Sequence, residues 1–384
     1  MELYIANAAL EAQEDALRQK LDTEDIDIVY LSEEEHSLDL NIPQVKYVCW
    51  PEDSREQAAV LDALLCENGY ERLHKSPLYK IKNPCDKNIL IYCPCAVARN
   101  LFFHLWDLND GYEPRRVSAF PAGSLSRYAF QNYQDGYTAA RCLYLNDSVH
   151  LYQAGLAAKI SEGENMEFYL IRHADPDYEN DALTEYGKKQ AEALGKRLAA
   201  EGIDFIYSSP LGRAQATAAP LARMLKKETV LLPWAAEVGL PAAYSPSSQL
   251  LNEDCLTKGY RWFENERFKN LPISEISSAA FGGLDCLLAI HGYRSVGNTY
   301  VADRPNPHRI ALFCHGYIGG TLLSHLFGLP INRTWAGTCL WTTGVTKFHF
   351  EETGNGYVPS CEYLNDRSHL FDLPDPNFDK LPKW

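Results

Sequence analysis

The sequence places an arginine and a histidine together at the end of an apolar run. Residues 168–171 (FYLI) predict a short buried strand, and Arg172 and His173 follow it directly. Loops after such strands are where open α/β sheets bind ligands. The planar guanidinium of arginine suits phosphate oxygens, and a neighbouring histidine can act as a nucleophile. The alternative interpretation is a histidine that merely ends a strand beside a solvated arginine.

Two later segments repeat this order of strand, polar residue and helix. Residues 205–210 predict a strand, and 211–217 begin a helix with Arg213 in its first turn, where the helix dipole also favours an anion. Residues 310–314 predict another buried strand, which ends at His315 and Gly316 before a helix over 318–327. Because parallel strands gather their carboxyl ends at one sheet edge, we expect both arginines and both histidines to lie there.

The segment between the first two strands predicts the crossover helix that a parallel sheet needs. Ala191, Leu194 and Leu198 recur at helical spacing, Thr184 can cap the start of the helix, and Gly202 can end it. The alternation of strands and helices predicts an α/β fold with three layers, α/β/α, around a mostly parallel central sheet.

Taken together, these segments resemble the histidine phosphatase superfamily, the phosphoglycerate mutase-like proteins, over about residues 166–370. The resemblance rests on Arg172-His173, LTEYGKKQA (183–191), SSPLGRAQATA (208–218) and Cys314-His315-Gly316. It implies that His173 becomes phosphorylated and that Arg172, Arg213 and His315 hold the phosphoryl oxygens. In having a glycine, Gly316, after the second histidine, the chain resembles the mutase-type branch of the family.

The resemblance also implies an acidic proton donor between Arg213 and His315. Glu237, in the segment WAAEVGL, is the position that best matches. Asp175 and Asp177 compete for this role because they lie next to His173, although Asp-Pro-Asp is also ordinary turn composition.

These residues are sufficient for a metal-independent phosphatase. A neutral His173 attacks phosphorus, the arginines and a charged His315 stabilise the phosphoryl oxygens, and Glu237 protonates the leaving alcohol. We expect no metal and no cofactor, with a small phosphorylated metabolite as the binding partner. The paired arginines of phosphoglycerate mutases are missing, since Arg261 and Arg267 are separate. Hydrolysis is therefore favoured over the alternatives, a phosphoglycerate-type mutase or a non-catalytic regulatory protein that binds a phosphorylated ligand.

The first 160 residues repeat the order of the rest without its phosphate chemistry. CLYLNDSVHL (142–151) echoes CEYLNDRSHL (361–370), and Cys93-Pro94-Cys95 stands against Cys314-His315-Gly316. ELYIANA (2–8) matches the strand before His173 but lacks the histidine, and His36 falls near the Arg213 position. We therefore predict two tandem phosphoglycerate mutase-like lobes: a degenerate pseudophosphatase domain at 1–160 and a catalytic domain at 166–384. A pseudo-dimer of the two lobes is a further hypothesis.

The composition of the chain limits which binding partners and which cellular compartment we expect. A formal net charge of −15 argues against an extended surface for nucleic acid or for an anionic membrane. No signal peptide or apolar span of about twenty residues is evident, so we expect a cytoplasmic protein. Eleven cysteines follow no disulfide framework. Cys85, Cys93 and Cys95 lack the spacing of a zinc site.

The stretch from Trp234 to Tyr293 lies between the expected proton donor and the second histidine. Its aromatic residues either cap the site or pack this insert onto the sheet, and packing is the more common use of large apolar side chains. They are Tyr244, Trp262, Phe263 and Tyr293. Arg261, Arg267 and Arg294 are candidates for a second anionic contact.

Overall fold

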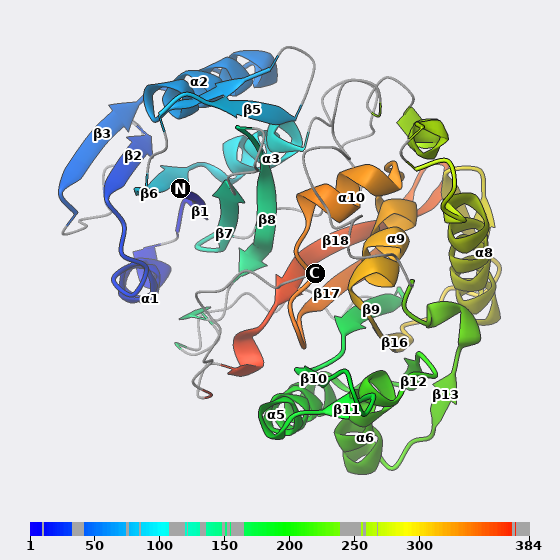
Figure 1. The fold of residues 1–384 in the computed structure, drawn as a ribbon. Helices are drawn as coiled ribbons and strands as arrows, with labels where there is room; N and C mark the ends of the chain where they lie inside the picture. Colours follow the sequence, from blue (N-terminus) through cyan, green and yellow to red (C-terminus); the bar gives the residue numbers. More distant parts are fainter. Residues whose placement is uncertain are drawn as a thin grey trace. The chain divides into compact units, whose positions relative to one another are not determined.

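The computed structural model is an α/β protein whose described elements form two compact units (Figure 1). Strands β1 to β8 belong to the N-terminal unit, and β9 to β18 belong to the C-terminal unit. The predicted α/β fold class is confirmed. The structure describes residues 1–9, 11–32, 42–73, 77–83, 86–106, 120, 122–130, 136–147, 150–151, 154, 165–238, 255, 259–266, 268–370 and 373.

The C-terminal unit is built on a mixed sheet with the order β13-β12-β16-β9-β17-β18-β15-β14. The first four strands are parallel and the remaining pairings are antiparallel, so the sheet is mixed rather than mostly parallel as predicted. The strands are β9 (Glu167–Arg172), β12 (Phe205–Ser208), β13 (Thr229–Leu231), β14 (Tyr293–Val296), β15 (Thr299–Ala302), β16 (Arg309–Cys314), β17 (Val345–Thr353) and β18 (Gly356–Asp366). The helices are α5 (Glu185–Glu201), α6 (Gly212–Leu225), α8 (Ile273–Ile290), α9 (Gly316–Phe327) and α10 (Ile331–Gly337).

Helices cover both faces of this sheet, which gives the unit three layers (Figure 1). Every residue of β9 is buried, as expected for a strand enclosed on both sides. Alternate side chains such as Tyr169 and Ile171 pack with Leu194 of α5 and Leu221 of α6. On the other face, Phe348 of β17 contacts Phe327 of α9 with ring centroids 5.4 Å apart.

The local signals of α5 and α9 explain where these helices lie. The side chain of Thr184 accepts a hydrogen bond from the Gly187 N–H, and Gly202 ends α5 in a left-handed conformation, as the sequence predicted. Helix α9 begins at Gly316, two residues before the predicted start. Of the described helices, α8 is the one whose length and composition would allow it to cross a membrane, and it packs into the C-terminal unit through Leu284 and Leu288.

The N-terminal unit has the sheet order β3-β2-β6-β1-β7-β8-β5-β4, again with four parallel strands followed by antiparallel pairings. The strands are β1 (Glu2–Asn7), β2 (Ile28–Ser32), β3 (Gln44–Val48), β4 (Tyr70–Arg72), β5 (Leu78–Ile81), β6 (Asn88–Cys93), β7 (Leu125–Phe130) and β8 (Tyr137–Asp147). The helices are α1 (Glu14–Leu21), α2 (Ser54–Glu67) and α3 (Cys95–Leu105).

The central strands of the two units end in the same register. Asn7 of β1 pairs with Cys93 of β6, as Arg172 of β9 pairs with Cys314 of β16. The next residue then donates its N–H across the sheet in both units: Ala8 to the Cys93 carbonyl and His173 to the Cys314 carbonyl, each at 2.9 Å. Ala8 therefore occupies the strand-end position in its unit that His173 occupies in the other.

Candidate active site

The parallel strands of the C-terminal unit bring the predicted residues to one edge of the sheet. Cys314 of β16 pairs with Arg172 of β9, and Phe313 pairs with Ser208 at the end of β12. The residues that follow these three strands, among them His173 and His315, therefore emerge at the same level.

The two histidines lie side by side and are almost completely buried. Their ring centroids are 5.1 Å apart, at an interplanar angle of 57°. His173 is 1 % exposed and His315 is fully buried. Their charge states are therefore set by protein groups rather than by bulk water.

His173 has one ring nitrogen engaged and one available. Its Nδ1 lies 2.8 Å from the carbonyl oxygen of Ala174, which can only accept a hydrogen bond, so Nδ1 carries the proton. In this tautomer the lone pair is on Nε2. Burial, assisted by the positive charges of Arg172 and Arg213, holds the pKa of His173 well below its usual value. His173 is thus a neutral imidazole at pH 7.

His315 is also neutral in this structure, and the expectation of a charged His315 applies to a site that holds a phosphoryl group. Burial and the positive charges of Arg213 and Arg172 lower the pKa of His315 to about 3. Its Nε2 lies 2.7 Å from the Ser209 hydroxyl oxygen, and its Nδ1 has no hydrogen-bond partner among the described residues. The sequence analysis did not single out Ser209, although it lies in the SSPLGRAQATA motif.

Both arginines are buried and fixed by hydrogen bonds. Arg172 donates from Nη1 to the carbonyl of Leu340, and Arg213 donates from Nη1 to Asp181 at 2.6 Å. The other carboxylate oxygen of Asp181 accepts the Gly212 N–H at 2.6 Å. This N–H belongs to the first turn of α6, where the sequence predicted a place for an external anion. The carboxylate of Asp181 takes that place.

Glu237 lies at the N-terminus of α9 and its carboxyl group is held by backbone donors. The N–H groups of Tyr317 and Ile318 approach its two oxygens at 3.3 and 3.1 Å. Burial raises the pKa of Glu237, while these hydrogen bonds and the charge of Arg172 act in the opposite direction. A carboxyl group with a raised pKa is suited to donate a proton.

The competing carboxyl groups have other partners. Asp175 accepts the Thr184 hydroxyl at 2.6 Å next to the start of α5. A hydrogen bond from Asn180 lowers the pKa of Asp177, which keeps this carboxylate ionised. Asp177 is therefore poorly suited to donate a proton, in contrast to Glu237, and the Asp175 carboxylate is engaged with the Thr184 hydroxyl.

The insert before β16 contributes packing and does not bring its buried aromatic rings to the histidines. Trp262 is 1 % exposed and its ring lies 5.1 Å from that of Phe268. Tyr293 is fully buried, 5.0 Å from the ring of Phe350. Tyr244 lies outside the described residues, as do His36, Arg267 and Cys85.

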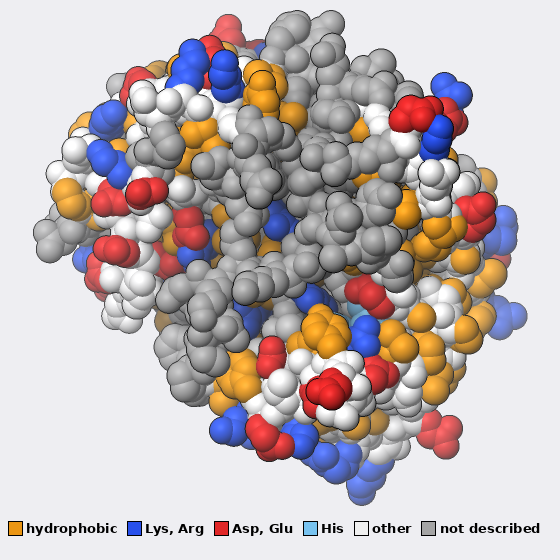
Figure 2. Space-filling model, viewed as in Figure 1, with side chains coloured by type: hydrophobic (Ala, Val, Ile, Leu, Met, Phe, Trp, Pro, Cys, Tyr) orange, Lys and Arg blue, Asp and Glu red, His pale blue; other side chains and the backbone are white. Residues whose placement is uncertain are grey.

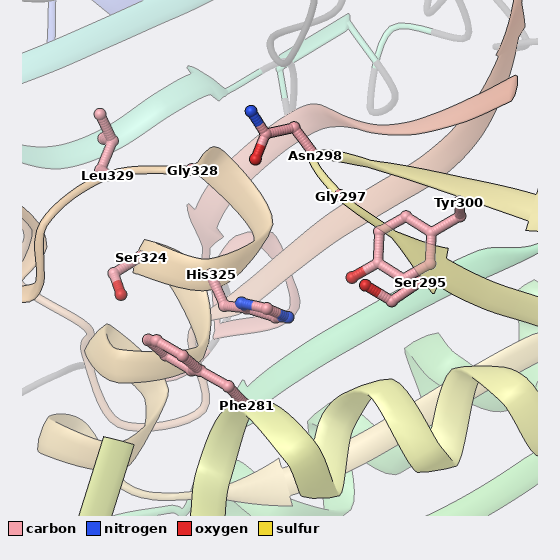
Figure 3. A pocket seen from close by; sticks show the side chains of 9 residues that line it. All are labelled: Phe281, Ser295, Gly297, Asn298, Tyr300, Ser324, His325, Gly328 and Leu329. Atoms are coloured by element: carbon pink, nitrogen blue, oxygen red, sulfur yellow. The ribbon is translucent and has the colours of Figure 1, made fainter. Parts of the chain in front are cut away.

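A small cavity of about 180 Å³ lies elsewhere in the C-terminal unit, where His325 of α9 stacks on Phe281 of α8 (Figure 3). It contains none of the predicted site residues. It is lined by Phe281, Ser295, Gly297, Asn298, Tyr300, Ser324, His325, Gly328 and Leu329. His325 Nε2 lies 2.9 Å from Asp285, and in the N-terminal unit His104 Nε2 lies 2.8 Å from Asp62.

The chain is similar in sequence to proteins of a known family. A family model described as histidine phosphatase superfamily (branch 1) matches residues 168–278. A probable phosphoglycerate mutase of Cronobacter sakazakii is 26 % identical over 183 residues, which are 43 % of this chain and 76 % of that protein. Phosphoserine phosphatase 1 of Hydrogenobacter thermophilus is 24 % identical over 214 residues, 53 % of this chain and 94 % of that protein.

Among solved structures, a mutant phosphoserine phosphatase of Entamoeba histolytica in complex with phosphoserine is 24 % identical. It covers 54 % of this chain and all of that one, with a TM-score of 0.39. The matched segment contains Arg172, His173, Arg213 and Glu237. His315 lies outside this segment but follows β16, which pairs with β9 and ends at the same edge of the sheet. Residues 168–278 of this chain therefore match the histidine phosphatase superfamily (branch 1).

Proposed function

We propose that this protein is a metal-independent phosphatase that hydrolyses a small phosphate monoester through a phosphohistidine on His173. The proposal rests mainly on the protonation and tautomer of His173. His173 is neutral, its Nδ1 proton is fixed on the Ala174 carbonyl, and Arg172, Arg213 and His315 all influence its pKa. Phosphoryl transfer requires a nucleophile with a free lone pair and nearby cations that stabilise the phosphoryl oxygens. His173 and the two arginines supply both.

In the first step, Nε2 of His173 forms a bond to phosphorus while the bond from phosphorus to the ester oxygen breaks. Glu237 gives its proton to the leaving oxygen. In the second step the Glu237 carboxylate takes a proton from water, which attacks the phosphohistidine and releases inorganic phosphate. We expect a bound phosphate dianion to raise the pKa of His315, since an opposite charge nearby favours the protonated ring. His315 then becomes a donor to the phosphoryl oxygens.

Hydrolysis is favoured over a mutase reaction by the placement of the remaining arginines. A mutase must hold a second anionic group of its substrate, which requires further cations at the site. Arg261 lies 3.9 Å from Glu264, and Arg294 lies 3.8 Å from Asp303, both as exposed ion pairs. The printed names of the relatives include both a phosphoserine phosphatase and a probable phosphoglycerate mutase, and these arginines support hydrolysis over mutase chemistry.

For the N-terminal unit we propose a pseudophosphatase domain over 1–160, in tandem with the catalytic domain over 166–384. Three features support a duplication: the equal strand order, the equal register of the central strands, and the His–Asp pairs that join α2 to α3 and α8 to α9. In that register Asn7, Ala8 and Pro94 stand where the other unit has Arg172, His173 and His315. The nucleophile and both of these phosphate ligands are replaced.

The partners follow from the charge and the enclosed site. On the face shown in Figure 2, acidic and basic side chains are interspersed, and the net charge of the chain is −15. This supports a small phosphorylated metabolite as the ligand, with no nucleic acid and no membrane as partner. A cytoplasmic location and a pseudo-dimer of the two units remain part of the proposal.

The test is phosphate release from a panel of phosphate esters by the full chain in the presence of a metal chelator. We expect turnover by the native protein and a loss of at least about 10³-fold in His173→Ala, as for other removed nucleophiles. Circular dichroism of the variant must match that of the native protein. Equal phosphate release by both proteins, or none by the native protein, would contradict the proposal. Binding of inorganic phosphate without any turnover would favour the regulatory alternative.

A further inference from the structure

An exposed aromatic side chain stands beside the predicted nucleophile. Tyr178 directly follows β10 (Pro176–Asp177), and its ring lies 6.4 Å from that of His173, nearly perpendicular to it at 85°. The guanidinium carbon of Arg213 lies 5.4 Å from the centre of the same ring. Tyr178 is nevertheless 64 % exposed. One ring therefore adjoins both the nucleophile and a phosphate-binding cation while most of its surface faces solvent.

The position of this ring is fixed by its loop rather than by packing of the tyrosine itself. β10 pairs with β11 (Ala182–Leu183), so the loop is closed by a short antiparallel hairpin. Within it, Asp177 accepts the Asn180 side-chain amide at 2.8 Å. Asp181 anchors the loop to Gly212 and Arg213 of α6. Because little of Tyr178 is buried, the fold gains little from an aromatic residue there.

The charge of the loop restricts what can stack on the ring. Asp177 and Glu179 flank Tyr178 in sequence, and Asp181 follows three residues later. Two cations, Arg172 and Arg213, influence the pKa of His173. Both are predicted to bind the phosphoryl group itself. A leaving group with a carboxylate would meet the acidic loop, whereas an uncharged planar group would meet the face of the tyrosine.

We propose that Tyr178 is a specificity-determining residue that stacks on an uncharged, planar leaving group of the substrate; this inference rests on the phosphatase function proposed above. The substrate class is a phosphate monoester of an aromatic or similarly flat alcohol. Its phosphoryl group passes to Nε2 of His173, its ester oxygen receives the Glu237 proton, and the released alcohol leaves along the tyrosine. Esters with an anionic leaving group, such as 3-phosphoglycerate, are poorer substrates.

The test compares benzyl phosphate with 3-phosphoglycerate, because both lose a primary alcohol and differ mainly in the ring and the carboxylate. The native protein should show the higher kcat/KM for benzyl phosphate. Tyr178→Ala should reduce that preference about three- to tenfold, the range of aromatic stacking, mainly through KM. Tyr178→Phe should restore the preference, because it keeps the ring. Glu179→Gln should raise kcat/KM for 3-phosphoglycerate relative to benzyl phosphate.

Inorganic phosphate separates a stacking role from damage to the phosphate site. It has no leaving group, so its competitive inhibition constant should change less in Tyr178→Ala than the KM for benzyl phosphate. Equal losses for both esters in Tyr178→Ala, or an unchanged preference, would overturn the inference while leaving the phosphatase function intact. Failure of the native protein to hydrolyse either ester or any other phosphate ester would instead refute the proposed function itself.

Discussion

His173 and His315 differ from ordinary surface histidines because burial and two arginines keep both rings neutral. The sequence predicted that these four residues would meet, since strand ends of a parallel sheet lie at one edge. It could not give the charge of His315, which depends on desolvation and on distances to Arg172 and Arg213 that arise only on folding. For the same reason it missed Asp181, which contacts Arg213 across space and has a positive φ of 47°.

The clearest prediction at this scale concerns Glu237. Glu237→Gln keeps the size and one acceptor oxygen, which can serve the Tyr317 or the Ile318 N–H but not both, and it cannot give up a proton. We expect kcat for benzyl phosphate to fall by about 10²-fold or more, the usual contribution of a positioned acid. Burial raises the pKa of Glu237, so the native carboxyl stays protonated to higher pH than an exposed glutamate, and activity declines as pH rises through that value. The measurement is the pH profile of kcat/KM.

Asp175→Asn is the matched control for this experiment. Its profile should keep the alkaline limb that Glu237→Gln loses. If Asp175→Asn removed the limb and Glu237→Gln retained it, Asp175 would be the proton donor and our assignment would be wrong.

At the scale of elements, the helices and strands with strong periodicity were predictable and the contacts between them were not. Thr184 and Gly202 predict the two ends of α5, because capping depends only on residues that are close in the sequence. The placement of Glu237 at the N-terminus of α9 joins residues about eighty positions apart. The resemblance selected Glu237, but the backbone donors that hold it belong to the fold.

Gly187 tests how closely α5 supports the site. A Cβ at this position would lie 2.2 Å from the backbone oxygen of Asp175, two residues after His173. Gly187→Ala must therefore displace the backbone beside the nucleophile. We expect a loss of about 1–3 kcal/mol in the free energy of unfolding, typical of overpacking, together with a lower kcat. Urea denaturation and steady-state kinetics give the two values.

Gly282→Ala provides the control within the same unit. Gly282 lies in α8, and a Cβ there would meet no atom within 4 Å. Because alanine is the better helix former, this variant should gain up to about 1 kcal/mol and keep its activity. Similar destabilisation by both substitutions would show that the effect of Gly187→Ala is not due to contact with Asp175.

At the scale of the whole molecule, the two units share a strand order but differ at one edge of the sheet. The sequence repeat predicted this difference, because Ala8 and Pro94 align with His173 and His315. The register of β1 with β6 and of β9 with β16 supports the same alignment. The position matching Arg213, at His36, lies outside the described residues. We therefore propose one phosphate site for each chain.

The most direct measurement is the amount and location of phosphoryl group trapped on the protein during turnover. The full chain is mixed with an excess of a hydrolysable labelled ester, denatured in base, and mapped by mass spectrometry. We predict an acid-labile, base-stable phosphoryl group on His173, approaching but not exceeding one per chain, and none in a folded His173→Ala variant. A protein that turns over without any such phosphohistidine, or that carries it on another residue or in the N-terminal unit, would contradict the account.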